Sequence, residues 1–246
     1  MTGYWRASRA PRHSLLFALP LLLLYELLAF TLSHDAILGV RNGADVLLKS
    51  LFVGLGGRDG LIAFGLLLVG TAAALVIRDR RRGGPIEPRI FVLMLVESVV
   101  YALLFGLVVG TLTGLLLGGL VAAPGMRLVA RQAPATLSLP TQLMISLGAG
   151  IYEELLFRVL LVGALAWGGR RLLGWGPRGA GVMATLVGAL VFSAFHYIGP
   201  YGDPLDLPSF TFRTLAGLVF SAMYLLRGFG ITAWTHALYD VFLTLG

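Results

Sequence analysis

The sequence contains no cysteine among its 246 residues. The protein therefore forms no disulfide, carries no thiol nucleophile and has no Cys-containing zinc site, and palmitoylation on cysteine is excluded. The sequence also lacks the Gly-x-Ser-x-Gly pattern of a serine hydrolase. Ser193, the serine nearest to a candidate motif, is for this reason not favoured as a nucleophile.

Charge is also scarce, since 13% of residues are charged and 57% are hydrophobic. Several runs lack charges over the roughly 20 residues that a helix needs to cross a bilayer. The fold class predicted is all-α, a polytopic membrane protein with about seven transmembrane helices. The net charge of +7 could indicate nucleic acid, but the basic residues form short clusters at the ends of apolar runs, as cytoplasmic anchors do. We expect the lipid bilayer as a partner and no nucleic acid.

Seven apolar segments are expected to be helices, at about 13–33, 59–77, 89–121, 141–167, 179–197, 210–226 and 231–246. The segment 44–53 has an amphipathic pattern suited to the membrane interface. The first helix follows three arginines but no clear cleavage site, so we expect it to be retained. By the positive-inside rule, the basic cluster at 78–82 predicts a cytoplasmic N-terminus, in a bacterial inner membrane.

One of these helices contains three ionisable residues, in the stretch Ile151–Leu160. Glu154 and Arg158 are four residues apart, the spacing of an intrahelical ion pair, whereas Glu153 faces another direction. A charge near the bilayer centre costs at least about 2.5 kcal/mol, so such residues usually mark a functional site. The alternative is that all three residues form a buried packing clamp.

Two other apolar helices carry a histidine with a partner four residues away: Phe192 with His196, and Asp240 with His236. A single histidine in such a helix is often only a hydrogen-bonded core residue. Together with the acidic stretch, however, the two motifs supply a carboxylate base and imidazoles, the groups that water-activating hydrolysis needs. His196 lies late in its helix and His236 early, so their depths match only if helices tilt or break.

The three motifs taken together resemble the CPBP family (CaaX protease and bacteriocin-processing, also called Abi or Rce1-like) of intramembrane endopeptidases. The resemblance covers about residues 141–246, the catalytic helices; residues 1–140 would be N-terminal helices and the interfacial segment of one integral membrane unit. It implies that Glu153 and His196 activate water, and that Glu154, Arg158 and Phe192 support the site. His236 and Asp240 would polarise the scissile carbonyl and stabilise the oxyanion.

Asp240 departs from the family pattern, in which many members have Asn. An ionised Asp cannot donate a hydrogen bond to an oxyanion, so Asp240 is either protonated or orients His236 instead. Glu153, His196 and His236 would also suit zinc. We expect no cofactor and metal-free catalysis, because the pair of Glu154 with Arg158 removes one potential ligand.

The function predicted is cleavage of a peptide bond in a membrane-associated protein. In relatives the substrates are prenylated C-termini, bacteriocin leaders or C-terminal sorting signals, and the sequence does not choose among them. Two alternatives remain open, a small proton-coupled transporter and a non-proteolytic membrane scaffold.

Overall fold

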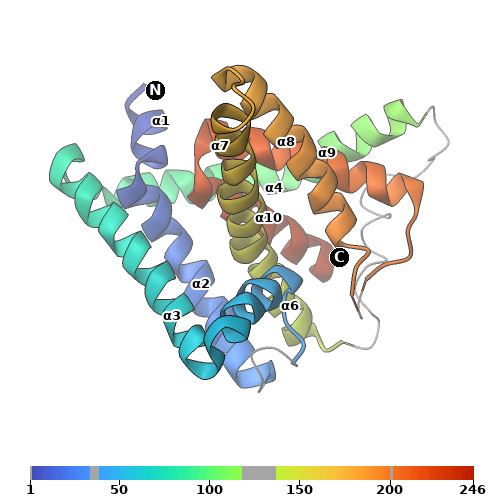
Figure 1. The fold of residues 1–246 in the computed structure, drawn as a ribbon, viewed down its shortest axis with the longest axis horizontal. Helices are drawn as coiled ribbons and strands as arrows, with labels where there is room; N and C mark the ends of the chain where they lie inside the picture. Colours follow the sequence, from blue (N-terminus) through green and yellow to red (C-terminus); the bar gives the residue numbers. More distant parts are fainter. Residues whose placement is uncertain (1, 34–38, 118–136, 200–201) are drawn as a thin grey trace.

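The structure is a computed structural model that describes residues 2–33, 39–117, 137–199 and 202–246. Every regular element in these ranges is a helix (Figure 1). The first four helices are α1 (Thr2–Arg9), α2 (Pro11–Ser33), α3 (Gly43–Gly83) and α4 (Pro88–Leu116). They are followed by α6 (Leu139–Gly148), η1 (Ala149–Val162), α7 (Gly163–Arg171), α8 (Pro177–Phe195), α9 (Leu207–Arg227) and α10 (Phe229–Leu245).

Five of these helices, α2, α3, α4, α8 and α9, are long and apolar enough to cross a membrane. At most 33% of the residues in their most apolar windows are buried inside the protein. Large apolar side chains such as Leu23, Leu66 and Leu107 are more than half exposed on the outside of the fold. Such a surface requires lipid around it, which confirms an all-α polytopic membrane protein.

The other two predicted spans form the centre of the fold. Residues 139–171 are one continuous helical run made of α6, η1 and α7, and α10 has 17 residues. In Figure 1 the olive run stands in the middle of the molecule, beside the red α10. The η1 segment packs against α2, α3, α8 and α10, so the acidic stretch is surrounded by protein.

The central stretch is wound as a π-helix over Ala149–Val162, where the sequence predicted ordinary α-helical spacing. π-helices hydrogen-bond from residue i to i+5 and are frequent at functional sites, usually as single turns. Gly150 lets this segment approach α10 closely, because a Cβ at that position would lie 2.3 Å from the carbonyl oxygen of Ala233. No pattern in the local sequence predicts this wider winding.

The core joins the two halves of the chain. One cluster of buried side chains takes members from α2, α3, α6, η1 and α10; it includes Leu21, Leu48, Met144, Tyr152 and Ala237. Residues 1–140 therefore pack against residues 141–246 through a shared apolar interior.

Two differences from the prediction concern where helices begin. Residues 2–9 form α1, where only a basic flank was expected. The helix after the predicted loop at 199–208 starts at Leu207 rather than 210, since Asp206 caps it and Pro208 occupies the first turn, where no amide donor is needed. Residues 200–201 of that loop, and the predicted extension of the third span to 121, lie outside the described residues.

The first helix is held by a buried ion pair. The Arg227 guanidinium contacts the Glu97 carboxylate at 2.5 Å, and the Tyr4 hydroxyl donates to the same carboxylate at 2.5 Å. Burial, followed by this hydrogen bond, raises the pKa of Tyr4 above its usual value. Tyr4 therefore stays protonated as a donor, and α1 is fixed against α4 and α9.

The long helix α3 is bent. Gly56 and Gly57 have non-helical backbone angles, and Gly57 has a φ of 57°, a conformation that favours glycine. The bend separates a first part, 43–55, from the long second part that includes the predicted span 59–77. The first part buries Asp45 and Lys49 against the protein and exposes Leu47, Leu51 and Leu55. Its polar face therefore packs inward.

Candidate active site

Glu153 lies at the centre of the polar residues in η1, with a side chain that is 9% exposed. Its Oε1 accepts a hydrogen bond of 2.8 Å from the side-chain amide of Asn42. Its Oε2 lies 3.9 Å from Nε2 of His196 and 3.9 Å from Nε2 of His236. The structure thus brings together the carboxylate and the two imidazoles that the sequence places on three separate helices.

The two imidazole rings are oriented by bonds to their far nitrogens. His196 stands at the end of α8, and its Nδ1 donates to the carbonyl oxygen of Phe192 at 2.8 Å. His236 lies in α10, and its Nδ1 donates to Oε1 of Glu154 at 2.7 Å. A carbonyl oxygen and a carboxylate oxygen both accept hydrogen bonds, so Nδ1 is the donor in each ring. Nε2 of each ring therefore faces Glu153.

Glu154 and Arg158 form the predicted ion pair. Nε of Arg158 lies 3.2 Å from Oε2 of Glu154, and the two side chains are at most 1% exposed. Glu154 thus contacts two groups at once, Arg158 through one oxygen and His236 through the other. The carboxylate that the sequence predicted to be structural also fixes a histidine of the site.

Aromatic rings enclose this ion pair. The Arg158 guanidinium lies 4.3 Å from the centre of the Phe192 ring and 5.3 Å from that of Phe220. Phe192 also contacts the His196 ring edge-on, with centroids 4.9 Å apart. Phe220, in α9, stacks on His236 at 4.3 Å. The predicted supporting residue Phe192 is therefore in contact with the site, and Phe220 joins it from a helix without a predicted site residue.

Asp240 lies at the edge of the site. Its Oδ2 is 3.7 Å from Nε2 of His236, beyond hydrogen-bond distance, and its side chain is 28% exposed. Glu154, rather than Asp240, makes the close contact that orients His236. The alternative in which Asp240 fixes the ring is thus not supported by the geometry.

The side chains of the site differ in their exposure. The side chains of His196 and Asp240 are 25% and 28% exposed, whereas that of His236 is 6% exposed. Glu153 lies behind them, against Asn42. His196 and Asp240 therefore form the more exposed edge of this cluster.

The predicted zinc ligands are farther apart than a metal requires. Two ligands of a tetrahedral zinc ion lie about 3.3 Å from each other. Each imidazole Nε2 is 3.9 Å from Glu153. Among the residues that the structure describes, no three His, Asp or Glu side chains are close enough to hold a metal ion. The donor types suit zinc, but the spacing does not fit it without movement of the histidines.

Sequence reasoning missed two residues of the site, Asn42 and Phe220. Asn42 precedes α3 in a Gly-containing stretch with no recognisable motif, and Phe220 is one of several aromatic residues in an apolar helix. Nothing in the local sequence connects either residue with Glu153 or His236.

A family model described as type II CAAX prenyl endopeptidase Rce1-like matches residues 135–242. No curated protein and no solved structure matches the chain. The matched segment contains Glu153, Glu154, Arg158 and the two histidine motifs, while Asn42 lies outside it. The chain is a polytopic membrane protein whose residues 135–242 are similar to the Rce1-like group of the CPBP family, a family of proteases.

Proposed function

We propose that this protein is an intramembrane endopeptidase that hydrolyses a peptide bond of a membrane-associated protein with water activated by Glu153 and His196. The observation that carries the proposal is the distance of 3.9 Å from Glu153 Oε2 to both imidazole Nε2 atoms. This separation is too long for a direct hydrogen bond and suits a bridging water molecule.

In the proposed reaction, Glu153 accepts a proton from water, and the hydroxide attacks the carbonyl carbon of the scissile bond. Nε2 of His196 carries a lone pair in the tautomer set by Phe192, so it can share this proton. The tetrahedral intermediate then breaks its C–N bond, and the proton passes to the leaving amine. One water molecule is consumed, and an acid and an amine are produced.

The developing oxyanion needs a hydrogen-bond donor. His236 supplies one at Nε2 when its ring is protonated, a state that the carboxylate of Glu154 at Nδ1 stabilises. An acid behind a histidine performs the same service in serine proteases. Asp240, 3.7 Å from that nitrogen, would assist as a second donor in its protonated form.

The substrate class follows from the setting of the site. Apolar spans surround it, so we propose a substrate that is itself held in the bilayer, through a prenyl group, a leader or a C-terminal sorting helix. The family description names CAAX prenyl endopeptidases, which favours a C-terminal substrate segment. No cofactor takes part in this mechanism.

The test compares cells that carry the wild-type chain with cells that carry Glu153→Gln. Protein termini in their membranes are measured by mass spectrometry. We expect a defined set of termini to vanish in the variant, and these termini name the substrates. Identical termini in both strains would refute proteolysis and favour a scaffold or a transporter.

A further inference from the structure

We infer that Asn42 is a positioning residue for Glu153, so that the active site extends beyond the family segment into the N-terminal half of the chain. This inference rests on the proposed function, in which Glu153 is the base. Asn42 is only 4% exposed, and its amide nitrogen donates to Oε1 of Glu153 at 2.8 Å across 111 positions of sequence. One carboxylate oxygen is thereby occupied, and Oε2 remains for water between the two histidines.

A capping role alone does not account for this contact. The side-chain oxygen of Asn42 accepts a hydrogen bond of 2.9 Å from the amide of Ala44 and caps α3. Capping uses only an oxygen acceptor, and Ser or Asp would serve as well. Asn also carries an amide nitrogen, which capping does not use, and this nitrogen donates to Glu153.

The backbone of Asn42 is itself fixed by α2 and α6. Its amide donates to the hydroxyl of Tyr25 at 3.4 Å. Gly148 lies so close that a Cβ there would be 2.7 Å from Cβ of Asn42 and 2.5 Å from the Tyr25 ring. With the cap on α3, contacts to three elements therefore hold Asn42 in place.

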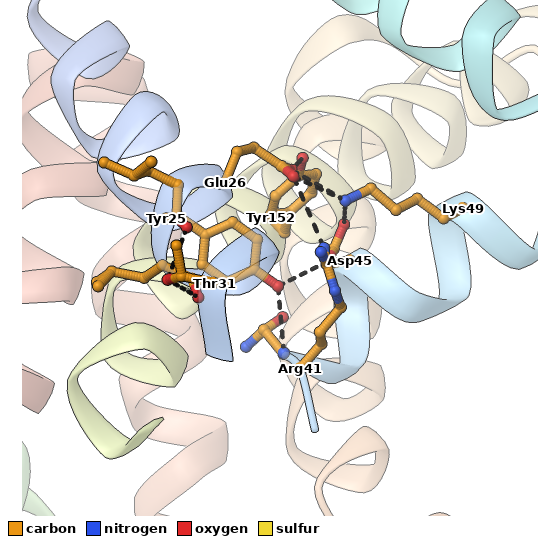
Figure 2. Close-up of polar contacts among 10 residues, drawn as sticks. Tyr25, Glu26, Thr31, Arg41, Asp45, Lys49 and Tyr152 are labelled. Carbon is orange, nitrogen blue, oxygen red and sulfur yellow. Dashed lines mark hydrogen bonds and ion pairs between the residues drawn. The ribbon is translucent and has the colours of Figure 1, made fainter. Parts of the chain in front are cut away.

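An ion network anchors the same turn (Figure 2). The Tyr25 hydroxyl donates to Asp45 at 2.6 Å, and Asp45 contacts Arg41 at 3.0 Å and Lys49 at 2.7 Å. Burial alone would lower the pKa of Arg41, but the hydrogen bond and the charge of Asp45 raise it above its usual value, so Arg41 remains a cation.

The network also reaches η1 directly. Lys49 lies 2.9 Å from Glu26 of α2, and the hydroxyl of Tyr152 donates to the same Glu26 (Figure 2). Tyr152 precedes Glu153 in the chain. Glu26, Asp45, Arg41 and Lys49 carry two negative and two positive charges, so the network fixes this part of η1 without placing a net charge beside Glu153.

The experiment separates positioning from capping. Asn42→Ser keeps an acceptor for the amide of Ala44, but its shorter side chain no longer reaches Glu153, whereas Asn42→Ala loses both contacts. Each variant, the wild type and Glu153→Gln are purified and reconstituted in separate vesicles. The substrate is a synthetic peptide. It contains a bond that is cut in cells with the wild-type chain and stays intact in cells with Glu153→Gln. The thermal unfolding midpoint is measured alongside kcat and KM.

We expect Asn42→Ser to lower kcat about 10- to 100-fold, as removal of an outer partner of an active-site group does. KM and the unfolding midpoint should remain close to those of the wild type. Wild-type kcat in Asn42→Ser, with Glu153→Gln inactive, would overturn the positioning role and leave the proposed function intact. Full activity of Glu153→Gln would instead overturn the proposed function, and the inference with it.

Discussion

His236 and Glu154 share a hydrogen bond of 2.7 Å although they are 82 positions apart in the chain. This bond connects α10 to η1 and turns Nε2 of His236 toward Glu153. The same carboxylate contacts Arg158, so one side chain joins this ion pair to the proposed catalytic groups. Glu154 is therefore expected to affect both the stability of the fold and the proposed reaction.

Replacing Arg158 by Ala should destabilise the protein. The change leaves the Glu154 carboxylate, which is fully buried, without its cation, at a cost of about 3–5 kcal/mol. We expect a marked loss of folded protein in size-exclusion chromatography. Arg171→Ala, an exposed arginine at the end of the same helical run, should give normal yield.

The double variant Arg158→Met with Glu154→Gln separates folding from chemistry. Removal of both charges should restore much of the yield, because no unpaired ion is then buried. Cleavage should not recover, since His236 has lost the carboxylate behind Nδ1. Recovery of both yield and cleavage would show that Glu154 serves only to pair Arg158.

Replacing His196 by Asn should lower kcat about 10²- to 10⁴-fold, the usual contribution of a group that transfers protons. His13→Asn is a matched control, because Nδ1 of His13 contacts the carbonyl oxygen of Ala7 at 2.9 Å much as His196 contacts that of Phe192. The other ring nitrogen of His13 accepts from the backbone amide of Glu87 and contacts no residue of the site, so cleavage per folded molecule should not change. Equal losses in both variants would assign His196 a structural role.

Asp240→Asn should retain cleavage, since an amide can donate a hydrogen bond to the oxyanion without first binding a proton. Asp240→Leu removes that donor and should lower kcat about 10²- to 10³-fold. Initial rates over a range of pH check both variants. Loss of cleavage in Asp240→Asn would mean that the negative charge of Asp240 is required.

Cleavage should not depend on a metal ion, because Glu153 lies 3.9 Å from each imidazole, too far for shared coordination of zinc. The purified protein should contain no stoichiometric zinc by elemental analysis and should keep its rate after dialysis against a chelator. Inactivation that zinc reverses would contradict this expectation and place a metal between the three side chains.

The contacts that the sequence predicted are the local ones. Glu154 with Arg158 follows from helical spacing within one segment, and the helices of 13–33 and 179–197 follow from apolar runs bounded by arginine or proline. Glu153 was expected to diverge from Glu154, and it does, toward His196 and Asn42. The spacing of residues along one helix depends only on the local sequence, so these contacts can be predicted without knowledge of the tertiary structure.

The remaining features depend on how distant segments meet. The bond of Glu154 to His236, the stacking of Phe220 and the amide of Asn42 join residues from helices whose packing no local pattern specifies. The difference in depth of His196 and His236 is likewise resolved only in three dimensions, where His196 reaches Glu153 from the end of α8 and His236 reaches it from the middle of α10. The π-helical winding of η1 also has no sequence signal, because its residues are ordinary helix formers.

The central claim is that Glu153 activates water, and hydrolysis by purified protein tests it most directly. Wild-type and Glu153→Gln chains are reconstituted in vesicles with the peptide identified from cellular termini, and kcat is measured with the unfolding midpoint. Gln keeps the size of the side chain and its acceptor for Asn42 but cannot take a proton. We predict a kcat at least about 10³-fold lower at an unchanged midpoint. A well-folded Glu153→Gln protein that cleaves at the wild-type rate would contradict the account.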